Sequence, residues 1–155
     1  MSTSQVDILL VEDSQEDLDL TLHILRKENL AKNIRVARDG EEALEFLQGE
    51  GSSAAGRPKL VLLDLKLPKI DGLQVLKQLK SDPLTRAIPV VILTSSKEER
   101  DLVKGYQLGA NSYIQKPVDF EQFRETIKAA GLYWLLINQA PMRDEKGKLP
   151  GLALQ

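Results

Sequence analysis

The chain has 155 residues, of which 42% are apolar and 28% charged, and its formal net charge is −2 at pH 7. This length and composition predict one soluble domain with its own hydrophobic core. The small net charge and the lack of a basic run argue against binding to nucleic acid or to an anionic membrane. Cysteine is absent and His23 is the sole histidine, which excludes disulfides, thiol nucleophiles and zinc sites built from Cys or several His side chains.

The N-terminal segment carries no basic stretch followed by a long apolar run, so we expect no signal peptide. No apolar stretch approaches the roughly 20 residues that a helix needs to cross a bilayer. We therefore expect a cytoplasmic protein that does not enter a membrane.

Short apolar runs alternate along the chain with segments in which apolar residues recur every three or four positions. Short runs of branched apolar residues indicate buried strands, and the spaced segments indicate helices with one face on a sheet. In chain order we predict a strand at 7–11, a helix capped by Ser14, a strand at 34–37, a helix opened by Asp39 and Gly40, and a loop at 49–58. A strand at 60–63, a helix at 72–80 and a strand at 89–93 follow. The last elements are a helix at 97–108 capped by Ser96 and ended by Gly109, a strand at 112–115, and a helix from about Asp119 with Phe120, Phe123, Ile127 and Ala130 on one face.

Five strand-helix repeats predict an α/β fold with a parallel sheet and helices on both faces. Because crossovers between parallel strands are right-handed, few topologies remain. We predict a doubly wound five-stranded sheet in the order 2-1-3-4-5, which is the flavodoxin-like (βα)5 arrangement.

Polar side chains follow four of the five predicted strands. Glu12 and Asp13 come after the first, Asp64 after the third, Thr94 after the fourth and Lys116 after the fifth. In open parallel sheets, ligands bind beyond the carboxyl ends of the strands where the strand order reverses, here between the first and third. We expect these five side chains to converge at that edge.

Three carboxylates at one edge repel one another unless a cation lies between them. Oxygen ligands without Cys or His favour Mg²⁺, with Mn²⁺ as the alternative ion. Such an ion would also hold a phosphate, Thr94 can donate its hydroxyl, and Lys116 supplies a positive charge for a phosphate oxygen. A central carboxylate such as Asp64 is a natural covalent acceptor of a phosphoryl group.

Each of these residues also has an ordinary structural interpretation. Glu12, Asp13 or Thr94 could cap the helix that follows it, and Lys116 could be a solvated lysine. An acid such as Asp64 after four apolar residues is poorly explained as a turn residue. The shared position at one sheet edge favours the binding site.

The chain resembles the receiver domain of two-component response regulators over about residues 6 to 130. The resemblance lies in Glu12-Asp13, in the segment from Asp64 to Gly72, in Thr94-Ser95 and in Lys116-Pro117. It implies that Asp64 is the phospho-acceptor. It further implies that Asp13 and Asp64 ligate Mg²⁺ directly, that the backbone carbonyl of Lys66 is a third ligand and that Glu12 acts through water.

The same resemblance assigns the phosphoryl response to three residues. Thr94 and Lys116 would bind phosphoryl oxygens, and Tyr113 would be the aromatic that changes rotamer on activation, although it could also be an ordinary half-buried strand residue. Lys116-Pro117 would be a cis peptide, or alternatively a trans proline that ends the strand. The phosphoryl donor would be a phosphohistidine on a sensor histidine kinase.

The segment from 131 to 139 is similar to the tails of stand-alone receivers that pair with phytochrome-type sensor kinases. We therefore expect a receiver domain at 1–131 and a C-terminal extension at 132–155, with no output domain. A homodimer would use an arm made of Tyr133, Trp134, Leu135 and Leu136. The alternative is that this apolar run covers the core of its own chain.

Two other functions fit part of the pattern. A haloacid-dehalogenase-like phosphatase also uses Asp, Thr, Lys and Mg²⁺, but it has a second Asp where this chain has Lys66. A degenerate receiver would serve only as a docking module. A functional receiver could pass its phosphoryl group to another histidine or bind an effector protein.

Overall fold

The structure is a computed structural model that describes residues 6–53, 56–95, 99–116 and 119–137. Five parallel strands form one sheet in the order β2-β1-β3-β4-β5, which confirms the predicted fold class and strand order. The strands are β1 (Ile8–Val11), β2 (Ile34–Ala37), β3 (Leu60–Leu63), β4 (Val90–Thr94) and β5 (Ser112–Gln115).

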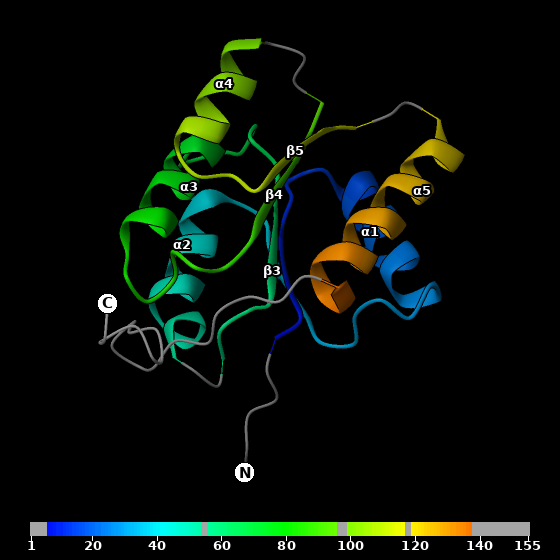
Figure 1. Cartoon of the computed structure of the whole chain (residues 1–155), viewed down its shortest axis with the longest axis horizontal. Helices are drawn as coiled ribbons and strands as arrows, with labels where there is room; N and C mark the ends of the chain where they lie inside the picture. Colours follow the sequence, from blue (N-terminus) through cyan, green and yellow to red (C-terminus); the bar gives the residue numbers. More distant parts are fainter. Residues whose placement is uncertain (1–5, 54–55, 96–98, 117–118, 138–155) are drawn as a thin grey trace.

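Helices cover both faces of this sheet (Figure 1). On one face α1 packs against α5, and on the other face α2, α3 and α4 lie side by side. The helices are α1 (Gln15–Lys27), α2 (Gly40–Gln48), α3 (Gly72–Ser81), α4 (Glu99–Gln107) and α5 (Phe120–Gly131), with a short 3₁₀ turn η1 (Glu50–Ser52) and a π-helical segment η2 (Leu132–Ile137). In the described part of the chain, no helix is long and apolar enough to cross a membrane.

The core consists of two apolar clusters, one on each face of the sheet. Residues of β1 alternate between them, since Leu9 and Val11 join the α2–α3 side while Ile8 and Leu10 join the α1–α5 side. The three interior strands β1, β3 and β4 are completely buried, as expected for continuous apolar runs covered on two faces. Their carboxyl ends are therefore held rigidly.

The helix starts follow the predicted capping residues. Ser14 Oγ accepts a hydrogen bond from the Asp17 amide at 3.3 Å, and Asp39 Oδ1 accepts one from the Glu42 amide at 2.8 Å. Gly109 has φ +105°, a conformation that favours glycine. Helix α4 begins at Glu99, and the predicted Ser96 cap lies outside the described residues.

The prediction that Phe120 lies on the inner face of the last helix is wrong. Phe120 is 48% exposed, whereas Phe123 and Ile127 are buried in the α1–α5 core. Phe120 is the first residue of α5, so no preceding turn of the helix covers it.

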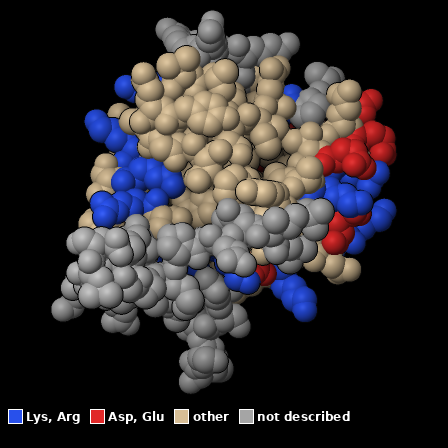
Figure 2. Space-filling view, in the orientation of Figure 1, with Lys and Arg blue, Asp and Glu red and all other residues tan. Residues whose placement is uncertain are grey.

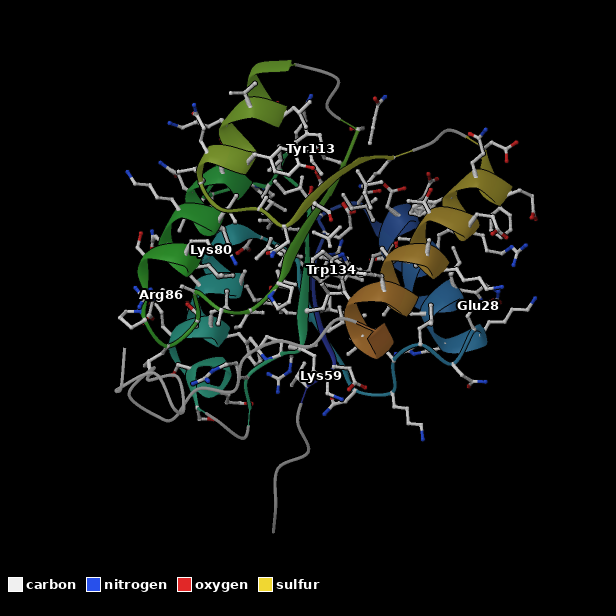
Figure 3. The ribbon with its side chains drawn as sticks, viewed as in Figure 1. Glu28, Lys59, Lys80, Arg86, Tyr113 and Trp134 are labelled. Atoms are coloured by element: carbon white, nitrogen blue, oxygen red, sulfur yellow. The ribbon has the colours of Figure 1, made fainter. Side chains whose placement is uncertain are left out.

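The apolar segment after α5 folds back onto the protein's own core. Trp134 and Leu135 are partly buried against the α1–α5 cluster, and Figure 3 shows Trp134 near the sheet at the end of α5. Tyr133 is 47% exposed and meets Trp134 edge to face, with ring centroids 4.9 Å apart. The side chain of Leu136 lies outside the described residues. Trp134 and Leu135 of the predicted dimer arm therefore cover the protein's own core, and Tyr133 lies on the surface.

Charged side chains gather at the flanks of the face seen in Figure 2. Lys and Arg occupy the left flank, acidic and basic side chains mix on the right, and the middle of this face is uncharged. The acidic and basic groups on the α1–α5 side include the ion pairs of Arg124 with Glu121 and Glu125 and that of Lys128 with Glu28.

Candidate functional site

The carboxyl ends of four strands bring the predicted site residues to one edge of the sheet. Glu12 follows β1, Asp64 follows β3, Thr94 ends β4 and Lys116 follows β5. β1 lies between β2 and β3, so the strand order reverses at the point where Glu12 and Asp64 emerge. This is the place where open parallel sheets bind ligands.

The Lys116 ammonium is the centre of the site. Its Nζ lies 2.5 Å from Glu12 Oε1, 2.8 Å from Asp17 Oδ2 and 3.0 Å from Asp64 Oδ2. The Lys116 side chain is 7% exposed, and those of Glu12 and Asp64 are 4% and 8% exposed. A cation so deeply placed among carboxylates is not a solvated surface lysine.

The site shifts the pKa values of the three most buried groups in different directions. Burial raises the pKa of Glu12 to about 7, helped by the neighbouring Asp64 charge and opposed by Lys116. Burial is the largest influence on Asp64 and acts to raise its pKa, but the Lys116 charge and the hydrogen bonds from Glu12, Lys116 and the Lys66 amide together outweigh it. They lower that pKa, which keeps Asp64 ionised at neutral pH. Burial acts to lower the pKa of Lys116, and its hydrogen bonds to Asp17 and Glu12 reverse the effect and raise it.

The backbone around Asp64 fixes the position of its carboxylate. The Asp64 amide donates to the Val11 carbonyl at 3.1 Å, and the Lys66 amide donates to Asp64 Oδ1 at 3.2 Å. The Gly72 amide then donates to the Leu65 carbonyl at 3.0 Å, which brings the start of α3 against this loop. One Asp64 oxygen thus faces Lys66 and the other faces Lys116.

Asp13 is exposed and does not join the contacts of Lys116. Its backbone carbonyl accepts a hydrogen bond from Arg38 Nη2 at 2.9 Å, and the chain then turns directly into α1. Glu12 Oε2 accepts the Ser14 amide at 3.2 Å, so Glu12 both supports the start of α1 and contacts Lys116. The capping interpretation and the binding-site interpretation of Glu12 are therefore compatible.

Thr94 and Tyr113 lie on the two strands nearest to Lys116. Thr94 is completely buried, and its backbone carbonyl accepts the Lys116 amide at 2.7 Å. Tyr113 is partly buried against the α2–α3 core, its amide donates to Tyr106 Oη at 3.2 Å, and Figure 3 places its ring on the α4 side of β5. Pro117 lies outside the described residues, so the predicted cis peptide stays a prediction.

Sequence reasoning missed Asp17. This residue lies three positions after the Ser14 cap, where an acidic side chain ordinarily bonds back to the cap amide. Here Glu12 takes the Ser14 amide, and Asp17 reaches Lys116, which is 99 positions away in the chain. The sequence carries no signal for this contact, because only the structure shows that Glu12 takes the donor that Asp17 would ordinarily use.

The donor set of the site suits a hard divalent cation. The side chains at this edge offer only oxygen ligands, and four carboxylates against one ammonium leave a formal charge of −3 from Glu12, Asp13, Asp17, Asp64 and Lys116. Among the described residues, however, no three acidic or His side chains form a ready metal cluster. The physical reason is that Lys116 Nζ lies between Glu12 and Asp64 while Asp13 is exposed to solvent.

Comparison with known proteins agrees with the resemblance to receiver domains. The family model of the response regulator receiver domain matches residues 8–128. The response regulator Rcp1 of Synechocystis sp. is 39% identical over 129 residues, covering 83% of this chain and 88% of Rcp1.

Solved structures of related proteins share the fold. The phosphorylated cyanobacterial phytochrome response regulator RcpA superposes with a TM-score of 0.81 at 40% identity, covering 89% of this chain and 99% of RcpA. The Mn²⁺-bound form of Rcp1 gives 0.79 at 36% identity, with 90% and 99% covered. The bacteriophytochrome response regulator AtBRR gives 0.66 at 51% identity, with 88% and 100% covered.

Proposed function

Because this chain belongs to the response regulator receiver domain family, we propose that it accepts a phosphoryl group on Asp64 from a sensor histidine kinase. The family is one of two-component signalling proteins, and this chain is a response regulator of that kind. The observation that carries the assignment of Asp64 is its contact with Lys116 at 3.0 Å, at the edge of the sheet where the strand order reverses.

The proposed reaction is a displacement at phosphorus by the Asp64 carboxylate. With acetyl phosphate as donor, an Asp64 oxygen forms the new P–O bond while the bond from phosphorus to the acetyl oxygen breaks, and acetate leaves with the electron pair. With a phosphohistidine donor, the P–N bond breaks and its electron pair returns to the imidazole nitrogen. Asp64 is suited to this role because its pKa is lowered and it needs no base.

Lys116 and Thr94 would stabilise the charge of the transferred group. The Lys116 ammonium lies within hydrogen-bond distance of the acceptor oxygen, and Thr94 ends the neighbouring strand. Charge stabilisation and positioning are the main protein contributions to phosphoryl transfer.

The cation of this site would be Mg²⁺, with Mn²⁺ as the alternative. Asp13, Asp64 and the Lys66 carbonyl would hold it directly, and Glu12 would act through water. When bound, such an ion neutralises phosphoryl charge as a Lewis acid. The oxygen-only donor set and the formal charge of −3 support this assignment, and Asp13 would have to turn inward from its exposed position.

The proposed output is a change of protein contacts rather than turnover of a substrate. Thr94 would follow the phosphoryl group and Tyr113 would change rotamer, altering the α4–β5–α5 face. Relatives described as phytochrome response regulators support a phytochrome-type kinase as partner. We further propose a receiver domain at 1–131, an extension at 132–155 that contributes Tyr133 to a homodimer, a cytoplasmic location, and an effector or histidine phosphotransfer protein downstream.

The same site bears on the two alternative functions, a phosphatase and a docking module. Membership of a signalling family sets aside the phosphatase hypothesis, and Lys66 occupies the position where that chemistry needs an acid. A docking module without phosphorylation would not require the buried contact of Lys116 with Asp64. Phosphorylation therefore separates the receiver from the docking module.

The test is the intact mass of the protein after incubation with acetyl phosphate and Mg²⁺. We expect the wild type to gain one phosphoryl group, and we expect Asp64→Asn or added chelator to abolish the gain. Asp71→Asn is the matched control, because Asp71 caps α3 through the Leu73 amide and Asn is an equally good cap. It should be phosphorylated like the wild type.

Two results would contradict the proposal. A phosphoryl gain that persists in Asp64→Asn would place the acceptor elsewhere. A wild type that neither gains a phosphoryl group nor binds beryllofluoride, which stands in for that group, would favour the docking module. Sizing chromatography of the same samples then reports whether a dimer forms and whether phosphorylation changes it.

A further inference from the structure

Lys116 uses its full hydrogen-bonding capacity in the unphosphorylated protein. A lysine ammonium has three N–H donors and no acceptor. Three carboxylate oxygens, from Glu12, Asp17 and Asp64, lie within 3.0 Å of Nζ. Each donor therefore has one partner, and the direction of the ammonium is determined.

Asp17 differs from the other two partners in its position and surroundings. Glu12 and Asp64 emerge from neighbouring strand ends and are almost fully buried, whereas Asp17 projects from the first turn of α1 and is 37% exposed. Glu12 and Asp64 are also among the ligands proposed for the cation, whereas Asp17 adds negative charge to the site but is not one of those ligands. Lys116 has to share Glu12 and Asp64 with the cation, but it keeps Asp17 to itself.

We propose that Asp17 is a positioning residue that holds the Lys116 ammonium beside Asp64 throughout phosphoryl transfer. This inference rests on the proposed function of Asp64. When an Asp64 oxygen becomes bonded to phosphorus, the donor that Lys116 gave to Asp64 passes to a phosphoryl oxygen. A second N–H of Lys116 stays hydrogen-bonded to Asp17. The ammonium can therefore rotate toward the phosphoryl group without leaving the site.

An ordinary structural role for Asp17 makes a different prediction. An acid in the first turn of a helix stabilises it through the helix dipole, whatever the direction of the side chain. Glu16 lies in the same turn, carries the same charge and is exposed. If the dipole alone explains Asp17, replacing Glu16 and replacing Asp17 should have equal effects.

The first measurement is made on the metal-free, unphosphorylated protein. Nitrogen-15 NMR detects lysine ammonium groups that exchange slowly with water, and Lys116→Arg assigns the signal of Lys116. We expect a slowly exchanging signal in the wild type and in Glu16→Ala, and its loss in Asp17→Ala. A signal that persists unchanged in Asp17→Ala would overturn the inference.

The second measurement is the rate of phosphorylation by acetyl phosphate and Mg²⁺. A hydrogen bond to a charged group corresponds to roughly ten- to hundredfold in rate, and the partial exposure of Asp17 favours the lower end. We therefore expect Asp17→Ala to react about tenfold more slowly and Glu16→Ala to react like the wild type. Asp17→Asn keeps an oxygen acceptor and the side-chain size, so it should recover part of the rate and should fold even if Asp17→Ala does not.

The outcomes separate this inference from the proposed function. A wild type that neither takes a phosphoryl group nor binds beryllofluoride overturns both. A wild type that is phosphorylated, with Asp17→Ala equally fast, overturns the positioning role alone. Equal slowing in Asp17→Ala and Glu16→Ala would also overturn it, because that result assigns the effect to the helix dipole.

Discussion

Replacing Gly72 by Ala should distort the loop that carries Asp64. Gly72 is buried at the start of α3, and a Cβ placed there would lie 2.4 Å from the Asp64 carbonyl oxygen and 2.6 Å from Leu65 Cα. Ordinary contacts of a Cβ begin at about 3.4 Å. The two segments would therefore have to separate by roughly 1 Å, and both contacts are with backbone that cannot rotate away.

The expected cost follows from these contacts. Forcing an extra carbon into a packed site costs about 1–3 kcal/mol, and Ala returns less than about 1 kcal/mol of helix propensity at such a position. We expect Gly72→Ala to lower the free energy of unfolding by about 1–2 kcal/mol, a factor of roughly 5–30 in the folded-to-unfolded ratio. Phosphorylation of Asp64 should also slow, because the carboxylate moves with its backbone.

Urea unfolding followed by circular dichroism measures this change. Gly105→Ala, within helix α4, is the control, because a Cβ there meets side chains and not backbone. It would lie 2.9 Å from the tip of the Ile92 side chain and at an ordinary 3.4 Å from the Tyr113 ring. The variant should change the unfolding free energy by less than about 1 kcal/mol, since a side-chain tip can shift and Ala favours the helix. A Gly72→Ala protein as stable as the wild type would refute the reasoning.

Three further predictions concern the core and two buried ionisable groups. Leu76→Ala should lower the free energy of unfolding by about 2–5 kcal/mol, because Leu76 is completely buried. Leu102→Ala, at an exposed position of α4, should change it by less than about 0.5 kcal/mol. Equal unfolding midpoints for the two variants would contradict this prediction. Burial raises the pKa of Glu12 from 4.5 to about 7, so between these pH values the folded protein holds a proton that the unfolded chain releases, and stability should fall as pH rises through this range. Glu12→Gln should remove that dependence, and an identical pH profile in both proteins would show the reasoning to be wrong. Burial lowers the pKa of Lys80 from 10.5 to about 8. Its ammonium donates hydrogen bonds to the carbonyls of Arg86 and Ile88, and Figure 3 shows Lys80 near Arg86. Here the unfolded chain binds more protons, so stability relative to Lys80→Met should rise from about pH 8 to pH 10, and a flat difference would count against it.

Much of the fold follows from local sequence pattern. The runs at 34–37, 60–63 and 112–115 are strands with the predicted limits. For 60–63 the reason is that a continuous apolar run covered on both faces has little freedom in its boundaries. Right-handed connections between parallel strands leave few topologies, and the predicted order is one of them. Residues after the strand ends had to meet at one edge, so Glu12, Asp64 and Lys116 were predictable as neighbours.

Tertiary packing decided the orientation of particular side chains. Phe120 has the spacing of an inward residue but is exposed at the first residue of α5. The sequence left Trp134 open to a dimer arm or to the core of its own chain, and the structure places it partly buried against that core. The spacing of apolar residues shows which residues share one face of a helix, but not how far along the helix the neighbouring elements cover that face.

The same division applies to the site. The residues that follow the strands can be read from the chain alone, and they supply the carboxylates, the hydroxyl and the ammonium of one sheet edge. The folded protein adds that Lys116 is buried among three carboxylates, that Asp13 is exposed and that Asp17 completes the set. The contact between Asp17 and Lys116 joins residues 99 positions apart. It depends on how the start of α1 and the end of β5 come together at the sheet edge, which no local rule of spacing or capping contains.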